Sequence, residues 1–267
     1  MDNKIFVATF SKDALSVAKQ YGYGLEINDL CISSNLDMKN RDAVLLRIRK
    51  EIAAVYGEEW FDSNPDIRRK VIFHGPFTEL TPAAIDERAI LLMEDRYRET
   101  IEICDEFGVK DLVLHDGYIP LIYQRNWHVK KSVEFWKKFM DDLPSDFNIY
   151  LENVFDDDPE ILSDVVDGVN DERLKICLDI GHANCMTREG LDVTAWIDCL
   201  VGRIGHFHFH NNYGKEDQHN ALEEGTLDIE EIIQKVCEKV GNNATITIES
   251  REAVKDAEFF KKMQEKA

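Results

Sequence analysis

Histidine and carboxylate residues gather in one stretch of this 267-residue chain, H-F-H-F-H-N-N-Y-G-K-E-D-Q-H, which begins at His206. His206, His208 and His210 alternate with two phenylalanines, and Asp217 and His219 follow after a short turn. Alternation at period two is typical of a strand, and it puts the three histidines on one face. Imidazole and carboxylate together are ligands of zinc, manganese and iron. The stretch therefore predicts a strand that delivers metal ligands at its C-terminal end and in the loop beyond.

Residues of the same types stand at or near the ends of six predicted strands. They are His74, His115, Glu152, Asp179, His208 and Glu249. Three further candidates, His182, Asp217 and His219, fall in predicted loops. One polar residue at a strand end needs no function, but six in register favour a shared site. Nine ligand-type side chains exceed what one ion uses, so one to three metal ions per chain are expected.

Eight short apolar segments alternate with helical patterns along the chain, and these elements must position the ligands. We predict strands at residues 4–10, 23–27, 71–74, 111–115, 148–152, 175–179, 204–210 and 244–249. We predict helices from about residue 13, at 40–56, 82–107, from about 129, at 159–166, 191–200 and 228–240, and at the C-terminus. Residues 28–70 are longer than one unit needs.

Strands that alternate with helices pair in parallel through β-α-β crossovers. Eight such units in 267 residues predict an α/β fold, the (β/α)₈ TIM barrel, in which strand ends converge on the mouth where active sites are built. A doubly wound open sheet is the alternative, but no glycine-rich nucleotide loop follows the first strand. No change in composition marks a boundary, so residues 1–267 are expected to form a single domain.

Composition limits the partners. The net charge of −20 argues against broad binding to nucleic acid or to an anionic membrane, although a local basic groove is compatible with it. The apolar run at residues 5–10 is too short for a signal peptide or a membrane span, so we expect a cytoplasmic protein. The six cysteines contain no C-x-x-C pair, and we expect reduced structural thiols.

Seven short motifs resemble those of the xylose isomerase-like barrel superfamily, which holds endonuclease IV and many sugar isomerases and epimerases. They are I-F-H-G-P at 72–76, L-V-L-H at 112–115, L-E-N at 151–153, C-L-D-I-G-H at 177–182, H-F-H-N-N at 208–212, D-Q-H at 217–219 and I-E-S at 248–250. The resemblance spans nearly the whole chain. It implies a divalent metal ion, zinc or manganese above all, and it allows a homo-oligomer, since relatives are often dimers or tetramers.

The resemblance first implies an isomerase or epimerase of sugars or sugar phosphates. In such relatives one metal has four ligands, here Glu152, Asp179, His208 and Glu249. The metal polarises a carbonyl of the sugar, while Glu152 and Glu249 act as acid and base on the adjacent carbon. The acidic chain suits a small neutral sugar as partner.

Further roles follow from the same resemblance. His182 would act in catalysis by binding a substrate oxygen, and Glu26, Trp127 and His210 are candidates for substrate contacts. His206 is expected beneath the metal as a residue of the barrel interior.

The second implied function is an endonuclease IV-like phosphodiesterase that acts on abasic DNA with three zinc ions. Its three ligand sets would be His74, His115 and Glu152; then Glu152, Asp179, His208 and Glu249; then His182, Asp217 and His219. Departures from that family weigh against it: its H-P-G-S stands here as H-D-G-Y from His115, its D-R-H as D-Q-H, and three aspartates at 156–158 would repel a DNA backbone. A non-catalytic metal-binding barrel is the third alternative, which intact Glu152 and Glu249 disfavour.

Overall fold

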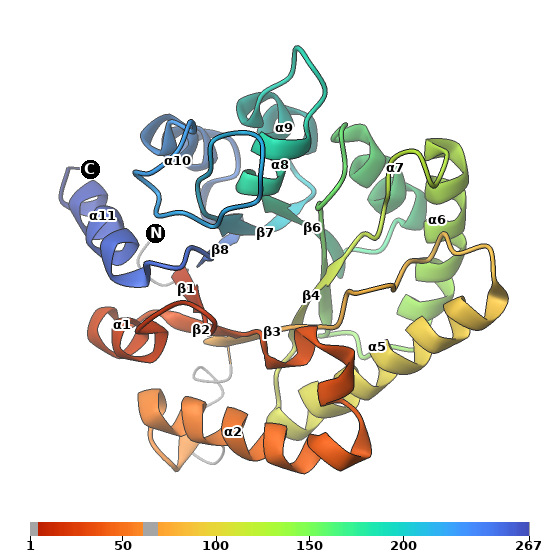
Figure 1. Ribbon diagram of the computed structural model, residues 1–267, viewed down its shortest axis with the longest axis horizontal. Helices are drawn as coiled ribbons and strands as arrows, with labels where there is room; N and C mark the ends of the chain where they lie inside the picture. The colour runs from red at the N-terminus through yellow and green to blue at the C-terminus, as the bar shows by residue number, and fades with distance from the viewer. Residues whose placement is uncertain (1–4, 61–68, 267) are drawn as a thin grey trace.

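Eight parallel strands form a closed barrel in the computed structural model, which describes residues 5–60 and 69–266. Each strand pairs with the next in the chain, and β8 pairs with β1 (Figure 1). The strands are β1 (Ile5–Ala8), β2 (Gly24–Ile27), β3 (Val71–His74), β4 (Asp111–His115), β5 (Asn148–Glu152), β6 (Leu174–Asp179), β7 (Ile204–Phe209) and β8 (Thr245–Ile248). The predicted TIM barrel is therefore confirmed.

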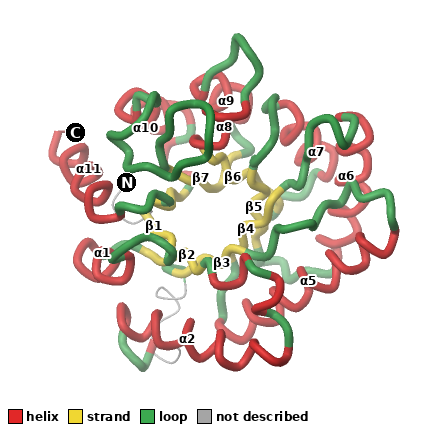
Figure 2. The backbone as a smooth tube through the Cα atoms, viewed as in Figure 1, coloured by secondary structure: helices red, strands yellow, loops and turns green. Residues whose placement is uncertain are grey.

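Helices surround the barrel on the outside (Figure 2). They are α1 (Ala14–Tyr21), α2 (Met38–Tyr56), α5 (Glu87–Phe107), α6 (Arg125–Asp141), α7 (Glu160–Val169), α8 (Ile180–Met186), α9 (Val193–Leu200), α10 (Ile229–Lys239) and α11 (Ala253–Lys266). Short 3₁₀ turns lie at η1 (Asp29–Cys31), η2 (Ser33–Asn35) and η3 (Gly241–Asn243). Over residues 5–60 and 69–266, no helix has the length and apolar character needed to cross a membrane.

The period-two alternation of each strand separates two cores. Outward residues such as Phe73, Leu151 and Phe207 are buried against the helices, in the main hydrophobic cluster. The inward positions hold a second, smaller cluster of Phe6, Ile72, Val113, Tyr150 and Cys177. The next inward positions towards the C-terminal ends of the strands carry the histidines and carboxylates. The pleat of the strands thus puts one layer, apolar except for Glu26 and His206, directly beneath the candidate site.

Several boundaries differ from those that the sequence predicts. The helix expected from residue 82 begins at Glu87, because the side chain of Asp86 accepts a hydrogen bond from the Arg88 amide and caps the helix there. The helix expected from about 129 begins at Arg125. The connection at residues 28–70 contains η1, η2 and α2, and residues 61–68 lie outside the described part of the chain.

Candidate metal centre

Five overlapping groups of metal-ligand side chains occur among the described residues, and three that together contain the predicted ligands lie side by side at the C-terminal mouth of the barrel. In each group the candidate ligand atoms lie within 4.8 Å of one another. The central group is Glu152, Asp179, His208 and Glu249; the first group is His74, His115 and Glu152; the third group is His182, His210, Asp217 and His219. All nine ligand residues suggested by the sequence are therefore brought together, and His210 joins them.

The central group surrounds one nitrogen of His208. Its Nδ1 lies 3.1 Å from Oε2 of Glu249, 3.3 Å from Oε1 of Glu152 and 3.7 Å from Oδ2 of Asp179. This nitrogen is buried and makes no hydrogen bond. Three carboxylates around one unpaired imidazole nitrogen form a site of high negative charge, which a divalent cation fits.

Glu26 supports this arrangement from below. Its side chain is fully buried, with Oε1 3.0 Å from Nε2 of His208 and Oε2 3.0 Å from Nε2 of His206. Thr247 donates a hydrogen bond of 2.5 Å to Oε2 of the same carboxylate. Burial alone would raise the pKa of Glu26, but the two histidines hold it well below its usual range. A carboxylate at Nε2 leaves Nδ1 of His208 as the nitrogen available to a metal.

The first group shares Glu152 with the central one. Oε2 of Glu152 lies 3.0 Å from Nε2 of His74 and 3.4 Å from Nε2 of His115, whereas Oε1 faces His208. Burial lowers the pKa of His115 to about 3, so its ring is neutral and able to bind a metal. Phe77 stacks on this ring, with centroids 4.1 Å apart. The two oxygens of Glu152 thus serve different groups.

The third group joins α8 to the loop after β7. Nε2 of His182 lies 3.3 Å from Oδ2 of Asp217, and Nε2 of His219 lies 3.0 Å from the same oxygen. The loop expected at His182 is in fact helix α8, because the side chain of Asp179 caps it by accepting the His182 amide. His210 lies one residue beyond β7 and is fully buried beside these residues.

The structure also locates the other candidates from the sequence. His206 lies in the barrel interior, stacked on Tyr150 at 5.5 Å, beneath the ligands as expected. Glu26 lies below His208 rather than on an open surface. Trp127 lies on α6, where its indole N–H donates to the Ala83 carbonyl, and it is not brought to any of the three groups. Substrate contact by Trp127 stays a prediction.

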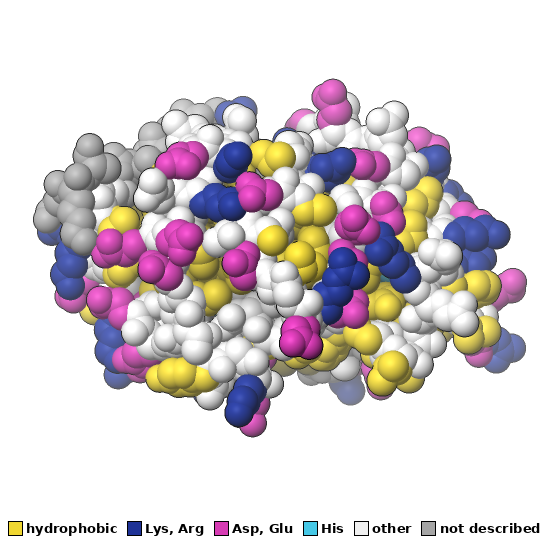
Figure 3. Space-filling model, turned by 90° about the horizontal axis from the view of Figure 1, so that it is seen from above, with side chains coloured by type: hydrophobic (Ala, Val, Ile, Leu, Met, Phe, Trp, Pro, Cys, Tyr) yellow, Lys and Arg dark blue, Asp and Glu magenta, His cyan; other side chains and the backbone are white. Residues whose placement is uncertain are grey.

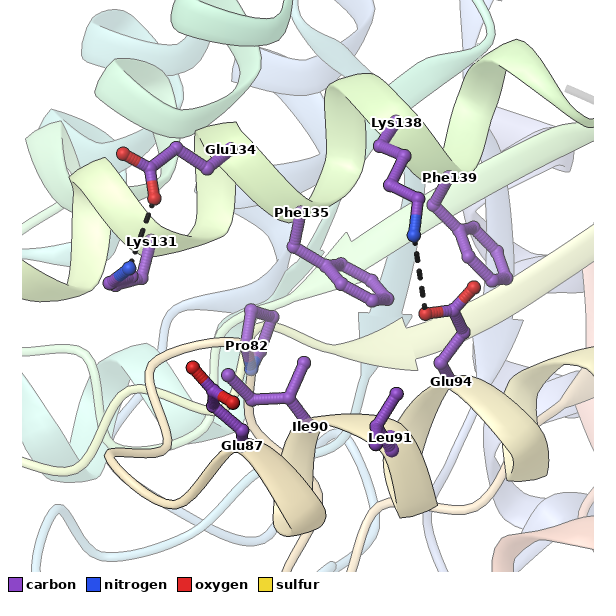
Figure 4. Close-up of a pocket in the computed structure, with 10 residues that line it drawn as sticks. All are labelled: Pro82, Glu87, Ile90, Leu91, Glu94, Lys131, Glu134, Phe135, Lys138 and Phe139. Carbon is purple, nitrogen blue, oxygen red and sulfur yellow. Dashed lines mark hydrogen bonds and ion pairs between the residues drawn. The ribbon is translucent and has the colours of Figure 1, made fainter.

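Two hollows differ in their relation to the metal-ligand groups. A cavity of about 500 Å³ borders the first group, and its lining includes His115, Phe77, Tyr118, Tyr123 and Phe155. A groove of about 330 Å³ lies between α5 and α6, with Phe135 between the helices and ion pairs of Lys131 with Glu134 and Lys138 with Glu94 (Figure 4). None of the three metal-ligand groups lies in the groove, so the cavity at the mouth is the candidate substrate site.

The loops at the mouth are strongly acidic. Their cations are Lys12, Arg188, Lys215 and Arg251, and Asp and Glu occur in them several times as often. The face drawn in Figure 3 likewise has Lys and Arg scattered among Asp and Glu without a basic patch. A polyanion would be repelled from such a surface, whereas a neutral ligand or a metal cation would not.

Eight parallel strands that bring buried histidines and carboxylates to one mouth define a TIM barrel with a candidate metal centre. The family described as the xylose isomerase-like TIM barrel matches residues 66–263, and this chain belongs to it. The resemblance inferred from the motifs is thereby confirmed.

Two relatives are similar to this chain over about 70% of its length. The uncharacterised protein MJ1311 of Methanocaldococcus jannaschii is 30% identical over 210 residues, which cover 73% of this chain and 70% of MJ1311. A probable endonuclease 4 of Mycobacterium leprae is 24% identical over 196 residues, 70% of this chain and 75% of that protein.

Solved structures of similar fold cover nearly the whole chain. A D-tagatose 3-epimerase-like protein superposes with a TM-score of 0.71 at 25% identity, over 98% of this chain and 97% of that one. The TTHB071 protein of Thermus thermophilus, soaked with ZnCl₂, has a TM-score of 0.74 at 20% identity, over 100% and 99% of the two chains. At that identity the second match supports the fold alone.

Proposed function

We propose that the protein is a metal-dependent isomerase or epimerase of a small, uncharged sugar. The observation that carries the proposal is the central group, in which Glu152 and Glu249 approach Nδ1 of His208 from two sides at 3.3 Å and 3.1 Å. Two carboxylates that approach one position from two sides can act on the two faces of a substrate held between them. The D-tagatose 3-epimerase-like neighbour supports the same class.

The residues of the central group would divide the work. A divalent ion bound by Glu152, Asp179, His208 and Glu249 would supply Lewis acidity towards a sugar carbonyl and its neighbouring hydroxyl. One glutamate removes the proton from the carbon next to the carbonyl, and the other returns a proton to the opposite face or to the neighbouring carbon. His182 lies on α8, with Nδ1 3.3 Å from Oε1 of Glu152, within reach of a substrate oxygen at the same place.

The lining of the mouth supports an uncharged substrate. The cavity beside His115 is lined by aromatic and aliphatic side chains together with Thr78, Glu79 and Thr81, without Lys or Arg among its lining residues. A sugar ring can lie against aromatic faces, whereas a phosphate group would need a cation or a set of backbone amides. We therefore expect ketoses and aldoses to be better substrates than their phosphates.

Proton exchange with solvent tests the proposal directly. Metal-loaded protein is incubated in ²H₂O with a panel of ketoses and their phosphates, and deuterium uptake at the carbon next to the carbonyl is followed by NMR. Glu152→Gln and Glu249→Gln should each lower the exchange rate by about 100-fold or more, because each removes one proton-transfer group. Glu223→Gln, at an exposed position of the loop after β7, is the matched control and should exchange like the parent. Full exchange in both active-site variants would refute the assignment.

A second function is favoured by one specific observation. The residues of all three ligand groups are present, and the first and central groups share Glu152, as an endonuclease IV-like phosphodiesterase with three zinc ions would require. The probable endonuclease 4 relative supports this alternative, and the acidic mouth opposes it. Cleavage of a duplex oligonucleotide with a single abasic site by zinc-loaded protein, with an intact duplex as control, would establish it. No cleavage at low salt would dismiss it.

A further inference from the structure

His210 is buried beside the carboxylates of Asp179 and Asp217, yet its ring nitrogens form no hydrogen bond. The side chain is fully buried, and neither ring nitrogen makes a hydrogen bond. Nε2 lies 3.1 Å from Oδ1 of Asp179 and 3.7 Å from Oδ1 of Asp217 without forming a hydrogen bond to either. A buried imidazole with two unpaired nitrogens is costly unless something else satisfies it. The ring therefore points to a ligand.

The other two histidines of the third group have rings that are already oriented for binding an ion. Nδ1 of His182 donates to the Asn153 carbonyl at 2.9 Å, and Nδ1 of His219 donates to the Glu249 carbonyl at 2.7 Å. Each backbone carbonyl fixes the tautomer in which Nε2 carries the lone pair, an arrangement common behind metal-bound histidines. Both Nε2 atoms lie beside Asp217.

Two separations in this group are close to those between the ligands of a tetrahedral zinc ion. Bonds of about 2.0–2.1 Å to a zinc ion put neighbouring ligand atoms about 3.3 Å apart. Nε2 of His182 and Nε2 of His219 lie 3.3 Å and 3.0 Å from Oδ2 of Asp217, whereas Nε2 of His210 lies 3.7 Å from the other oxygen, Oδ1. His210 and His219 stack in this structure, with ring centroids 4.0 Å and planes 19° apart, so one ring must turn before both can bind the same ion in their ring planes.

A glycine makes room for His210. Any Cβ at Gly181 would overlap the imidazole ring of His210, because the ring lies against the Gly181 backbone. Glycine at position 181 is therefore required by the position of the His210 ring. Gly181 allows the ring to reach the group formed by His182, Asp217 and His219.

We propose that His210 is a fourth protein ligand, so that His182, His210, Asp217 and His219 form a closed tetrahedral site for zinc or a similar ion. Four protein ligands leave no open position, which is the mark of a structural metal site. The ion would tie α8 and the end of β7 to the loop that carries Asp217 and His219. A closed site could not offer a coordination position to a phosphate, which weighs against the endonuclease function.

Cobalt absorption tests the proposal without any assay of activity. Metal-free protein is titrated with Co²⁺ against a chromophoric chelator, because four-coordinate tetrahedral Co²⁺ absorbs visible light strongly and six-coordinate Co²⁺ weakly. The parent should bind one equivalent with the intense band. His210→Asn should lower the affinity for that equivalent of cobalt by at least about 10–100-fold. Loss of a residue that only hydrogen-bonds to a metal ligand already lowers metal affinity by this factor. His128→Asn, which changes a buried histidine outside the third group, should keep both band and affinity.

Gly181→Ala provides a second, independent arm. It removes no ligand, yet the added methyl group should displace His210 and weaken the same equivalent of cobalt. Weak absorption from the fully loaded parent would overturn the proposal, as would equal cobalt affinity of the parent and His210→Asn. The proposal changes one assignment of the isomerase function, because His182 would hold the ion of the third group and not a substrate oxygen, whereas proton transfer stays with the central group. Deuterium exchange at the substrate carbon reports on that group, and the cobalt band reports on this one.

Discussion

Replacing Glu26 by glutamine should weaken metal binding at the central group, although Glu26 is not one of the four residues of that group. Oε2 of Glu26 is hydrogen-bonded to Nε2 of His206 at 3.0 Å, and Oε1 lies in ion-pair contact with Nε2 of His208, also at 3.0 Å. A carboxylate can accept from both rings, but an amide has only one oxygen and presents its NH₂ group to the other ring. One of the two histidines must then change tautomer or move.

The size of the effect follows from the position of that carboxylate. If His208 changes tautomer, its Nδ1 carries the proton and cannot face the carboxylates of Glu152 and Glu249 as a ligand. Loss of a group that orients a metal-bound histidine lowers affinity about 10–100-fold, or about 1.4–2.8 kcal/mol. Thr247→Val removes only the hydroxyl that donates to Glu26 and should have a smaller effect in the same direction.

Calorimetric titration of metal-free protein with Mn²⁺ measures these affinities. Glu223→Gln, at an exposed site, is the control for loss of one negative charge. The sequence alone suggested Glu26 as a substrate contact, and the assay separates the two roles. Unchanged Mn²⁺ affinity in Glu26→Gln, together with a raised KM for the sugar, would refute the positioning role.

Three further predictions concern stability. Asp256→Ala should lower the free energy of unfolding by about 1–3 kcal/mol, because the buried Asp256 carboxylate accepts from the Leu222 amide and from the Ser250 hydroxyl. Asp198→Ala breaks only the surface ion pairs with Lys235 and Lys239, and it should cost less than about 1 kcal/mol in the same urea titration. Gly24→Ala should cost about 1–3 kcal/mol in urea denaturation, since the new methyl group would overlap the Phe6 ring inside the barrel. Metal-free protein should lose stability as the pH rises. Burial alone would lower the pKa of His219, but Asp217 and Glu249 raise it to about 9. The stabilisation by protonated His219 is therefore fully present below about pH 6.5 and is lost as the pH rises through about 9. Urea midpoints at pH 6 and pH 9.5 should differ for metal-free protein and differ less for zinc-loaded protein.

The ends of several strands were predictable because their apolar segments stop at a residue that can bind a metal. His74, His115, Glu152 and Asp179 each end a strand where the sequence suggested, and all four reach the mouth. The register of a strand fixes which side chains face inward, so a pattern of period two carries this information along the chain.

Residues beyond the strand ends were harder to predict. His210 continues the alternation of His206 and His208, yet its membership of the third group depends on where α8 and the loop with Asp217 fold back. Glu26 has a strand position like the others, but only the barrel closure puts it beneath His208 instead of beside a substrate. Both depend on contacts between residues far apart in the chain, which local patterns do not encode.

Glu152 links the number of bound ions to the chemistry that the mouth can perform. Its Oε1 faces His208 and His182, while its Oε2 faces His74 and His115. With an ion in the central group alone, Oε2 is left to take or give a proton, as an isomerase requires. With ions in both groups, each oxygen is engaged and Glu152 no longer serves as a base, so only chemistry that relies on the ions themselves remains. The number of metal ions per chain in active protein therefore distinguishes the isomerase from the phosphodiesterase, which sequence similarity does not.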